Sequence, residues 1–269
     1  MLGSALLAIT GIAYGAGTWW AVAAFYEPWR QRWAYGLAWV GWLAETGWLG
    51  WSAYALGGTA LFTLDRWLGL LEWLSLAVFF VFASRRNWET VLGFLLPVIF
   101  LLWAVGILTA SARSRPDVLG ALLVLHILLA ALAYVALLLS ALLATMYTEK
   151  ERELRRKHVR LFYYRLPALE SMDGLSASLI TAGVVLLMAA IFTGAVWEKE
   201  VSGRYWTWSA KEIWTLVTWV AYSLYLLARW RWGWRGHRAA VWAMAAFLLV
   251  VVNLFAINAL FPGFHALVF

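Results

Sequence analysis

The chain is a series of long apolar runs separated by short polar segments. Each run approaches the ~20 residues that a helix needs to cross the hydrocarbon core of a bilayer. The runs show no alternation of apolar and polar residues, so the pattern predicts an all-α integral membrane protein, a polytopic bundle of about eight transmembrane helices. The predicted spans cover residues 2–26, 33–57, 66–83, 91–110, 118–146, 175–197, 212–230 and 238–260.

Composition supports this fold class and limits the domain organisation. Of 269 residues, 64% are hydrophobic and 13% are charged, with a mean hydropathy of +0.76. A soluble domain of this length cannot bury so much apolar surface. We therefore expect a single transmembrane domain over 1–269, in which 1–117 carries no recognisable motif and 118–269 carries those described below. The chain has no cysteine, which excludes disulfides and thiolate metal sites.

The basic residues predict how the chain crosses the membrane. One set of predicted loops carries fifteen of the 21 lysines and arginines, seven of them between Lys150 and Arg165, and the opposite set carries six. Cytoplasmic loops are enriched in basic residues, so the richer side is expected to be cytoplasmic and both termini extracytoplasmic. This charge distribution fits contact with membrane lipid and gives no reason to expect binding of nucleic acid. The first run continues to Phe25 without a basic segment before it, and reads as a span rather than a cleavable signal peptide.

Two of the four histidines fall on the predicted extracytoplasmic side. His126 lies roughly 12 Å into the fifth span, and His265 follows the last span. An ionisable residue within a span suggests function, although a neutral imidazole bonded to a neighbouring helix would explain His126 as well. Two imidazoles can saturate haem iron as axial ligands.

A Trp-rich stretch, "GRYWTWSAKEIW" at 203–214, is predicted on the same side as these histidines. Haem needs flat apolar walls and cations for its two propionates; Tyr205, Trp206 and Trp208 are candidates for the walls, and Arg204 and Lys211 for the cations. Tryptophan is also enriched at membrane interfaces, and the chain has 21 of them, so an interfacial belt is the alternative interpretation.

The motifs of 118–269 resemble those of a known family. The family likeness rests on "LLVLHILLAALAY" at 122–134, "RLPALESMDGLSASLI" at 165–180, "FTGAVW" at 192–197, "GWRGHRAA" at 233–240 and "NALFPGFH" at 258–265. It rests most on the order Gly203, Trp206, Trp208, Lys211, Glu212, Trp214. These features resemble the Trp-rich haem-handling signature of the cytochrome c assembly proteins of the CcsA/ResC type.

The resemblance implies a role in c-type cytochrome biogenesis. It implies a multi-pass protein of the cell inner (cytoplasmic) membrane that binds haem b and presents it at the extracytoplasmic face for attachment to apocytochrome c. His126 and His265 match the two axial ligands, and Gly203, Arg204, Tyr205, Trp206, Trp208 and Lys211 the surrounding site. No catalytic side chain is assigned. An extracytoplasmic partner subunit is expected, and the chain is a candidate for the haem-handling subunit of a haem-lyase (synthetase) complex.

The sequence departs from the family pattern at several positions. Ser202 and Ser209 replace a tryptophan and an aspartate, Ala210 replaces a proline, and Leu227 stands where family members that carry haem across the membrane have a histidine. These departures keep open a HemX-type haem-responsive regulator of tetrapyrrole biosynthesis without catalysis. An unrelated permease is a third possibility.

Overall fold

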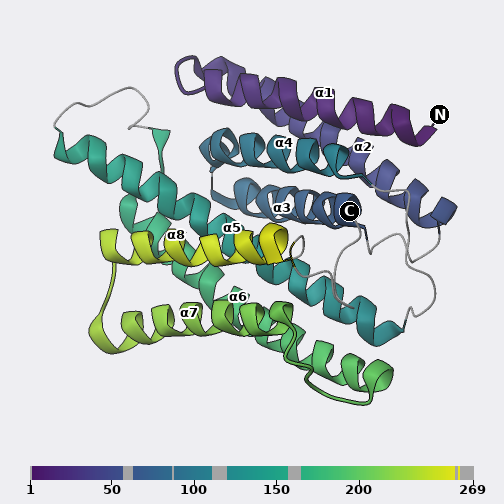
Figure 1. The fold of residues 1–269 in the computed structure, drawn as a ribbon. Coiled ribbons are helices and arrows are strands. Elements are labelled where there is room, and N and C mark those ends of the chain that lie inside the picture. The colour runs from purple at the N-terminus through teal and green to yellow at the C-terminus, as the bar shows by residue number, and fades with distance from the viewer. Residues whose placement is uncertain are drawn as a thin grey trace. The chain divides into compact units, whose positions relative to one another are not determined.

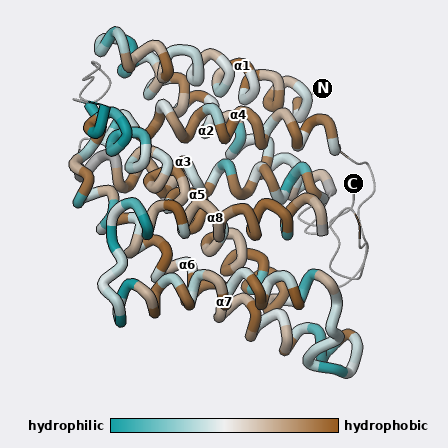
Figure 2. The backbone as a smooth tube through the Cα atoms, turned by 60° about the vertical axis from the view of Figure 1, so that its left-hand side comes forward, coloured by the Kyte–Doolittle hydropathy of each residue, from teal (hydrophilic) through white to brown (hydrophobic). Residues whose placement is uncertain are grey.

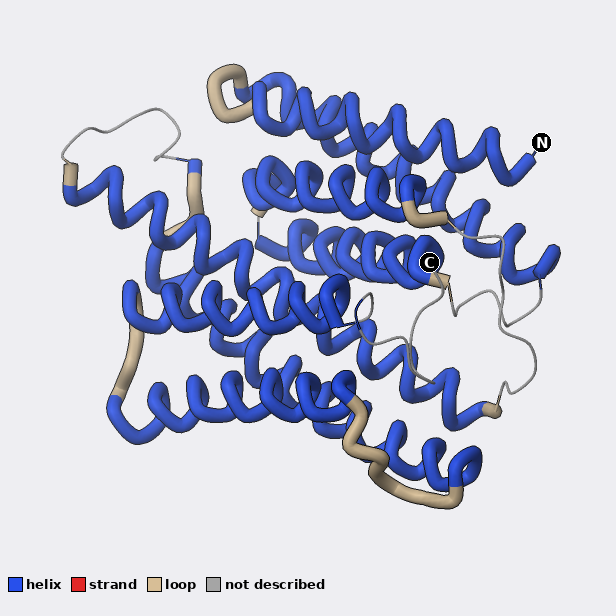
Figure 3. Tube along the Cα trace, viewed as in Figure 1, coloured by secondary structure: helices blue, strands red, loops and turns tan. Residues whose placement is uncertain are grey.

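The computed structural model describes residues 2–56, 63–86, 88–110, 120–156, 165–257 and 260. It divides into two compact units. Unit 1 comprises 1–118, 157–167 and 268–269, and unit 2 comprises 119–156 and 168–267. The secondary structure of both units is helical (Figure 3). The organisation as a single domain stays a prediction.

Unit 1 is built from α1 (Leu2–Ala23), α2 (Gln31–Leu56), α3 (Leu64–Arg86) and α4 (Leu92–Leu108), with short 3₁₀ turns at Pro28–Arg30 and Glu89–Val91. Helix α1 packs on α2 and α4, and α3 packs on α4. Close packing depends on glycine where an aromatic ring approaches the opposite helix. A methyl group at Gly41 would overlap the Tyr14 ring, and one at Gly11 would overlap the ring of Trp103.

In unit 2, four helices run alternately up and down: α5 (Ala121–Arg155), α6 (Leu169–Ser202), α7 (Ala210–Trp232) and α8 (His237–Val252) (Figure 1). Helix α8 continues as a π-helical turn, η5 (Asn253–Ile257). The start of α5, the end of α6, the start of α7 and the end of α8 therefore lie at one end of the unit. Its core includes Leu137, Ile180, Val184 and Tyr222. The loop between α6 and α7 thus lies at the end at which α5 begins.

Within the described part of the chain, five helical segments are long and apolar enough to cross a membrane: Leu2–Ala23, Glu89–Leu108, Ala121–Arg155, Leu169–Ser202 and His237–Ala256. The chain is a multi-pass membrane protein. Helices α2, α3 and α7 coincide with the other predicted spans but carry more charges or tryptophans. The total of eight spans and the sides of the termini stay predictions.

Two helices are longer than the sequence pattern predicts. Helix α5 has 35 residues and α6 has 34, so each is roughly 50 Å long, against about 30 Å of bilayer hydrocarbon. Hydrophobic segments occupy the middle of α5, α6 and α8, and the ends of α6 and α7 are more hydrophilic (Figure 2). Helix α6 therefore carries the following loop beyond its most apolar part.

Several tryptophan side chains pack one helix against another. The indole N–H groups of Trp214, Trp219 and Trp242 donate to the backbone carbonyls of Leu249, Val184 and Ala221 respectively. In unit 1, Trp42 donates to the carbonyl of Trp73. An indole buries a large apolar area and satisfies its one polar group in the same contact. These residues need no functional explanation.

Candidate functional site

The Trp-rich loop, residues 203–209, is bounded by two specific helix signals. Helix α6 ends at Gly203, whose φ of +78° is left-handed and whose N–H donates to the Lys199 carbonyl. Glycine is favoured there because it has no Cβ to clash. Helix α7 begins after Ser209, which forms a capping box with Glu212. The loop is short because a glycine ends α6 and a capping box begins α7 only a few residues later (Figure 3).

Glu212 also holds the loop on either side of Trp208. Its Oε2 accepts the backbone N–H groups of Thr207 and Ser209, each at 3.1 Å, and its Oε1 accepts the Thr207 hydroxyl at 2.8 Å. Trp208 lies between these anchored residues with a φ of +57° and is 72% exposed. A bulky residue in this conformation costs of order 1–3 kcal/mol and persists only where neighbours enforce it. The loop thus holds an indole outward at an energetic cost.

The other tryptophan of the loop, Trp206, has an unsatisfied polar atom. Trp206 is half-buried, and its ring packs edge-on against Trp208 with 6.1 Å between centroids. Its Nε1 is buried and has no hydrogen-bond partner among the described residues. Buried N–H groups are almost always paired, so an unpaired one indicates a missing acceptor. A ligand oxygen at this loop would complete it.

Three basic side chains lie in the loop or in the helix turns next to it. Lys199, in the last turn of α6, donates to the Tyr205 hydroxyl at 2.7 Å and lies 4.2 Å from the centre of its ring. Arg204 is exposed, and its guanidinium forms no ion pair with any residue that the structure describes. Lys211 is half-buried in the first turn of α7. The loop can therefore attract an anionic group.

His126 lies at the same end of unit 2, in the second turn of α5. Its Nδ1 is 2.7 Å from the Ala190 carbonyl oxygen of α6. A carbonyl oxygen can only accept, so Nδ1 carries a proton, and in the neutral imidazole the ring's lone pair is then on Nε2. The imidazole lies against Gly194, where an added Cβ would come within 2.8 Å of its Cε1. Gly194 is nine residues before Gly203, roughly 14 Å along the helix axis.

The π-helical turn η5 precedes the predicted second ligand, His265, in the sequence. Asn253 is 1% exposed and donates through Nδ2 to Tyr134 of α5 and Thr215 of α7, both at 3.0 Å. It begins the π-helical turn η5. Such turns occur frequently at functional sites. His265 itself lies outside the described residues, as does the predicted cytoplasmic His158.

The structure thus brings together Gly203, Arg204, Tyr205, Trp206, Trp208 and Lys211 in one loop and the adjoining helix turn, with His126 at the same end of the unit. Sequence reasoning missed Lys199, Ala190 and Asn253. Lys199 had a signal, since it is a cation in a last helical turn close to an aromatic loop. The Ala190 carbonyl had none, because it depends on how α5 and α6 pack.

The departures from the family pattern at the loop have structural roles. Ser209 stands where the family has aspartate, and both residue types are favoured N-caps. Ser202 donates to the Glu198 carbonyl and accepts the Arg204 N–H. Leu227 is 43% exposed in the penultimate turn of α7, towards the opposite end of the unit from the loop.

Comparisons with known proteins agree with the sequence motifs. The family model described as "Cytochrome C assembly protein" matches residues 61–265, more than half of the chain. Cytochrome c biogenesis protein CcsA of Synechococcus sp. (strain CC9605) is 32% identical over 180 residues, covering 59% of this chain and 59% of that protein. The proteins of the same name from Prochlorococcus marinus (strain MIT 9303) and Trichormus variabilis are 32% identical over 176 residues and 40% identical over 102 residues.

The match to the Prochlorococcus protein covers 56% of this chain and 55% of that protein, and the match to the Trichormus protein covers 38% and 29%. This chain therefore aligns with less than two thirds of the length of these curated relatives. The family model, in contrast, includes all four helices of unit 2 and both candidate histidines. The chain belongs to the cytochrome c assembly protein family.

Proposed function

We propose that the chain takes part in cytochrome c biogenesis by binding haem at the end of unit 2 that carries the Trp-rich loop. Family membership and the names of the relatives support the general role. Under the predicted orientation this end is extracytoplasmic in the inner membrane, where haem b would be presented to apocytochrome c. The chain would act there with an extracytoplasmic partner subunit, within a lipid bilayer.

The hydrogen bond from His126 to the Ala190 carbonyl is the observation that carries the proposal. Histidines that ligate metals almost always donate their second ring N–H to a carboxylate, carbonyl or water, which fixes the tautomer and the ring orientation. His126 has this arrangement, with Nδ1–H on the carbonyl at 2.7 Å. In the neutral imidazole this bond leaves the lone pair that iron ligation requires on Nε2. His265 is proposed as the second axial ligand from the family motif.

The loop residues fit the remaining requirements of a haem site. The exposed face of Trp208 offers a wall for the porphyrin plane, and the unpaired Nε1–H of Trp206 a donor for a propionate oxygen. Arg204 and Lys211 would neutralise the propionates, and Gly203 lets the backbone turn without a side chain in the way. Tyr205 is held by Lys199, so it would border the site rather than close over it.

The chemistry that haem supplies when bound is that of its vinyl groups, to which cysteine thiols of the apocytochrome add. The chain's own part would be to hold the haem iron through the imidazoles of His126 and His265 and to orient the haem with the loop residues. The proposal assigns no acid–base role to a side chain of this chain. It suits the haem-handling subunit of a synthetase complex.

The alternative, a HemX-type regulator of tetrapyrrole biosynthesis, is not favoured. The relatives described above carry the name of cytochrome c biogenesis. The loop also holds Trp208 outward in a strained conformation, which a regulator without a haem-presenting face would not need.

Optical spectroscopy of the purified protein tests the proposal. The wild type should show the spectrum of a six-coordinate, low-spin haem. His126→Gly should lose it, and added imidazole should restore it in part by entering the space of the missing side chain. Asp173→Asn, at the far end of α6, controls for general destabilisation and should keep the low-spin spectrum. An unchanged low-spin spectrum in His126→Gly would refute the proposed ligand.

A further inference from the structure

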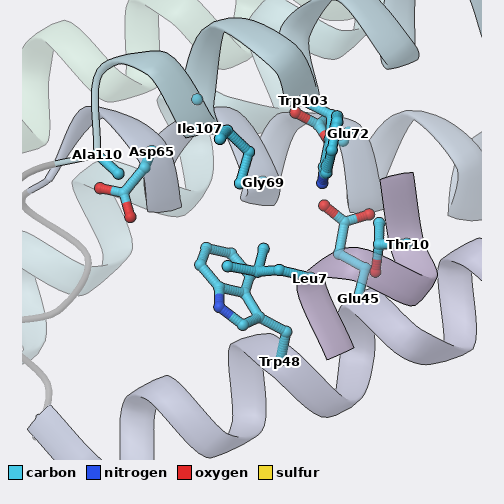
Figure 4. Close-up of a pocket in the computed structure, with 11 residues that line it drawn as sticks. Leu7, Thr10, Glu45, Trp48, Asp65, Gly69, Glu72, Trp103, Ile107 and Ala110 are labelled. Carbon is cyan, nitrogen blue, oxygen red and sulfur yellow. The ribbon is translucent and has the colours of Figure 1, made fainter. Parts of the chain in front are cut away.

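Unit 1 contains a small cavity that the haem proposal does not use. It has a volume of about 30 Å³ and is lined by residues of α1, α2, α3 and α4 and by Ala110 just beyond α4. A cavity needs about 10–15 Å³ to hold a water molecule. Figure 4 shows the Glu45 carboxylate pointing towards the side on which Glu72 and Trp103 lie, with Asp65 at the other end beside Ala110.

Two glutamates are buried together at the inner end of this cavity. Glu45 is 2% exposed and Glu72 is 1% exposed. Both carboxyl groups line the same cavity, and the Tyr14 hydroxyl donates to Glu45 Oε2 at 2.5 Å. Two ionised carboxylates buried together repel each other strongly, so the pair holds a proton between them. Because Glu45 also accepts from Tyr14, Glu45 is the better anion and Glu72 is the acid.

Among the residues that the structure describes, no basic side chain lines the cavity beside the pair. The titratable groups that face it are Tyr14 from α1, Glu45 from α2, and Asp65 and Glu72 from α3, whereas α4 contributes the neutral Trp103. Two negative charges in this site would be strongly unfavourable. Protonation of one carboxyl is the available way to reduce the charge.

Unsatisfied polar atoms also line the cavity, and they are complementary. Glu72 Oε2 and Asp65 Oδ1 lack donors, and Trp103 Nε1 lacks an acceptor, among the described residues. Buried polar groups of this kind are usually satisfied by water. One water molecule offers two donors and two acceptors. Beside the pair it can donate to Glu72 Oε2 and accept from Trp103 Nε1, whereas Asp65 Oδ1 lies roughly 10 Å along α3, at the other end of the cavity (Figure 4).

The cavity follows one face of α3 from the pair to the helix start. Asp65, Gly69 and Glu72 are spaced i, i+4 and i+7, so they lie on one side of the helix. Gly69 leaves room between them, since an added Cβ would approach a Trp48 ring carbon within 2.9 Å and Glu45 Oε1 within 3.4 Å. Asp65 is half-buried in the first turn of α3. It marks the end at which the cavity can exchange with solvent.

We propose that Glu45 and Glu72 form a proton-binding site in unit 1 that shares one proton, holds a water molecule in the adjoining cavity, and exchanges with solvent past Asp65. The site is separate from the haem site of unit 2. A divalent metal is a poorer ligand, because Ca²⁺ and Mg²⁺ need about six or more oxygen ligands. The described residues also contain no group of three or more His, Cys, Asp or Glu side chains placed to hold a metal.

Infrared difference spectroscopy of the full-length protein in nanodiscs tests this site. The carbonyl stretch of a protonated carboxylic acid is separate from the amide bands and shifts in D₂O. We expect the wild type to show this band at neutral pH and Glu72→Gln to lose it. Glutamine is nearly isosteric, and its amide can donate to Glu45 in place of the acid. Tyr14→Phe should keep the band but shift it, because Glu45 loses its second donor.

Two further variants separate the site from its access route. Asp65→Asn should retain the band and slow its shift after transfer to D₂O. Glu27→Gln, which removes an exposed carboxylate paired with Arg30 in the same unit, should leave the band and its exchange unchanged. Absence of the band from the wild type, or its persistence at full intensity in Glu72→Gln, would overturn the proposal. Equal exchange in wild type and Asp65→Asn would overturn the access route.

Discussion

The two units place their polar groups in opposite ways. In unit 1, Glu45 and Glu72 are buried among four helices, and a tyrosine hydroxyl caps the pair. In unit 2, a core of aliphatic and small residues continues to a loop whose tryptophans and cations lie at the end of the helices. Unit 1 can therefore bind a proton at a buried site, and unit 2 can bind a large planar ligand at its end.

The difference shows how helix length and helix ends determine where chemistry can occur in a membrane protein. Helices α5 and α6 exceed the hydrocarbon thickness, so the loop after α6 can extend towards the aqueous boundary. The cavity in unit 1 depends instead on a glycine and on side-chain spacing within α3. Substitutions that affect one arrangement should leave the other intact.

Apart from loss of the His126 ligand itself, the largest expected effect comes from Gly194→Ala in unit 2. The added Cβ would lie within 2.8 Å of the His126 ring and displace it from the Ala190 carbonyl. Changes in the support of a metal ligand typically cost 10–100-fold in affinity, so we expect at least a tenfold loss of haem affinity, measured by optical titration. Gly174→Ala, on the same helix with no atom near its added Cβ, should bind haem as the wild type does. Equal affinities of the two variants would contradict the role of Gly194.

Substitutions in the Trp-rich loop should have a smaller effect on haem. Trp206→Ala and Trp208→Ala should each lower the haem retained per protein after detergent purification about fivefold, the equivalent of roughly 1 kcal/mol of lost ring contact. Trp230 is 83% exposed on α7 and provides a matched control. If Trp230→Ala lowers retention as much as Trp208→Ala, the loop is an interfacial belt.

Gly41→Ala applies the same kind of steric change to unit 1. The new methyl group would overlap the Tyr14 ring, and overpacking of this kind costs about 1–3 kcal/mol. The protein should therefore melt at a lower temperature, while its haem spectrum stays that of the wild type. Gly50→Ala, on the same helix with open space around it, should be neutral or stabilising by up to about 1 kcal/mol. A change in the haem spectrum of Gly41→Ala would show that the two units are coupled.

The smallest expected effect is at the cap of α7. Glu212→Ala removes the acceptor for three donors of the loop and should destabilise the protein by about 1 kcal/mol. Glu212→Gln keeps a carbonyl acceptor at the capping-box position and should cost less. Thermal unfolding followed by circular dichroism separates the two. Equal melting temperatures of wild type and Glu212→Ala would contradict the capping role.

The apolar runs were sufficient to predict each helix, but the predicted spans leave a longer loop, over 198–211, than the structure shows. The observed helix ends at Gly203 and Ser209 agree with known end preferences. The apolar pattern predicts an earlier end for α5 and α6 than the structure shows. Amphipathic turns after an apolar run, such as those up to Ser202, continue the helix but do not raise the hydropathy of the segment. Local pattern cannot show where such a helix stops until a glycine such as Gly203 ends it.

The contacts that define the two sites were not predictable. His126 was a candidate from its position in a span, but its Ala190 partner is 64 residues away in sequence. Glu45 and Glu72 lie in two different predicted spans, and only the packing of α2 and α3 shows that they line one cavity. Such pairings depend on rotations of neighbouring helices, which one sequence does not determine.

A haem titration of three purified proteins tests the central claim, that one haem is held in unit 2 through His126. The apo-forms of wild type, His126→Gly and Glu72→Gln are titrated with haem, and stoichiometry and affinity are read from the low-spin absorption. We expect one low-spin haem per chain in wild type and Glu72→Gln with equal affinity, and none in His126→Gly. Low-spin binding by His126→Gly with wild-type affinity, or an equal loss of affinity in Glu72→Gln, would contradict the claim.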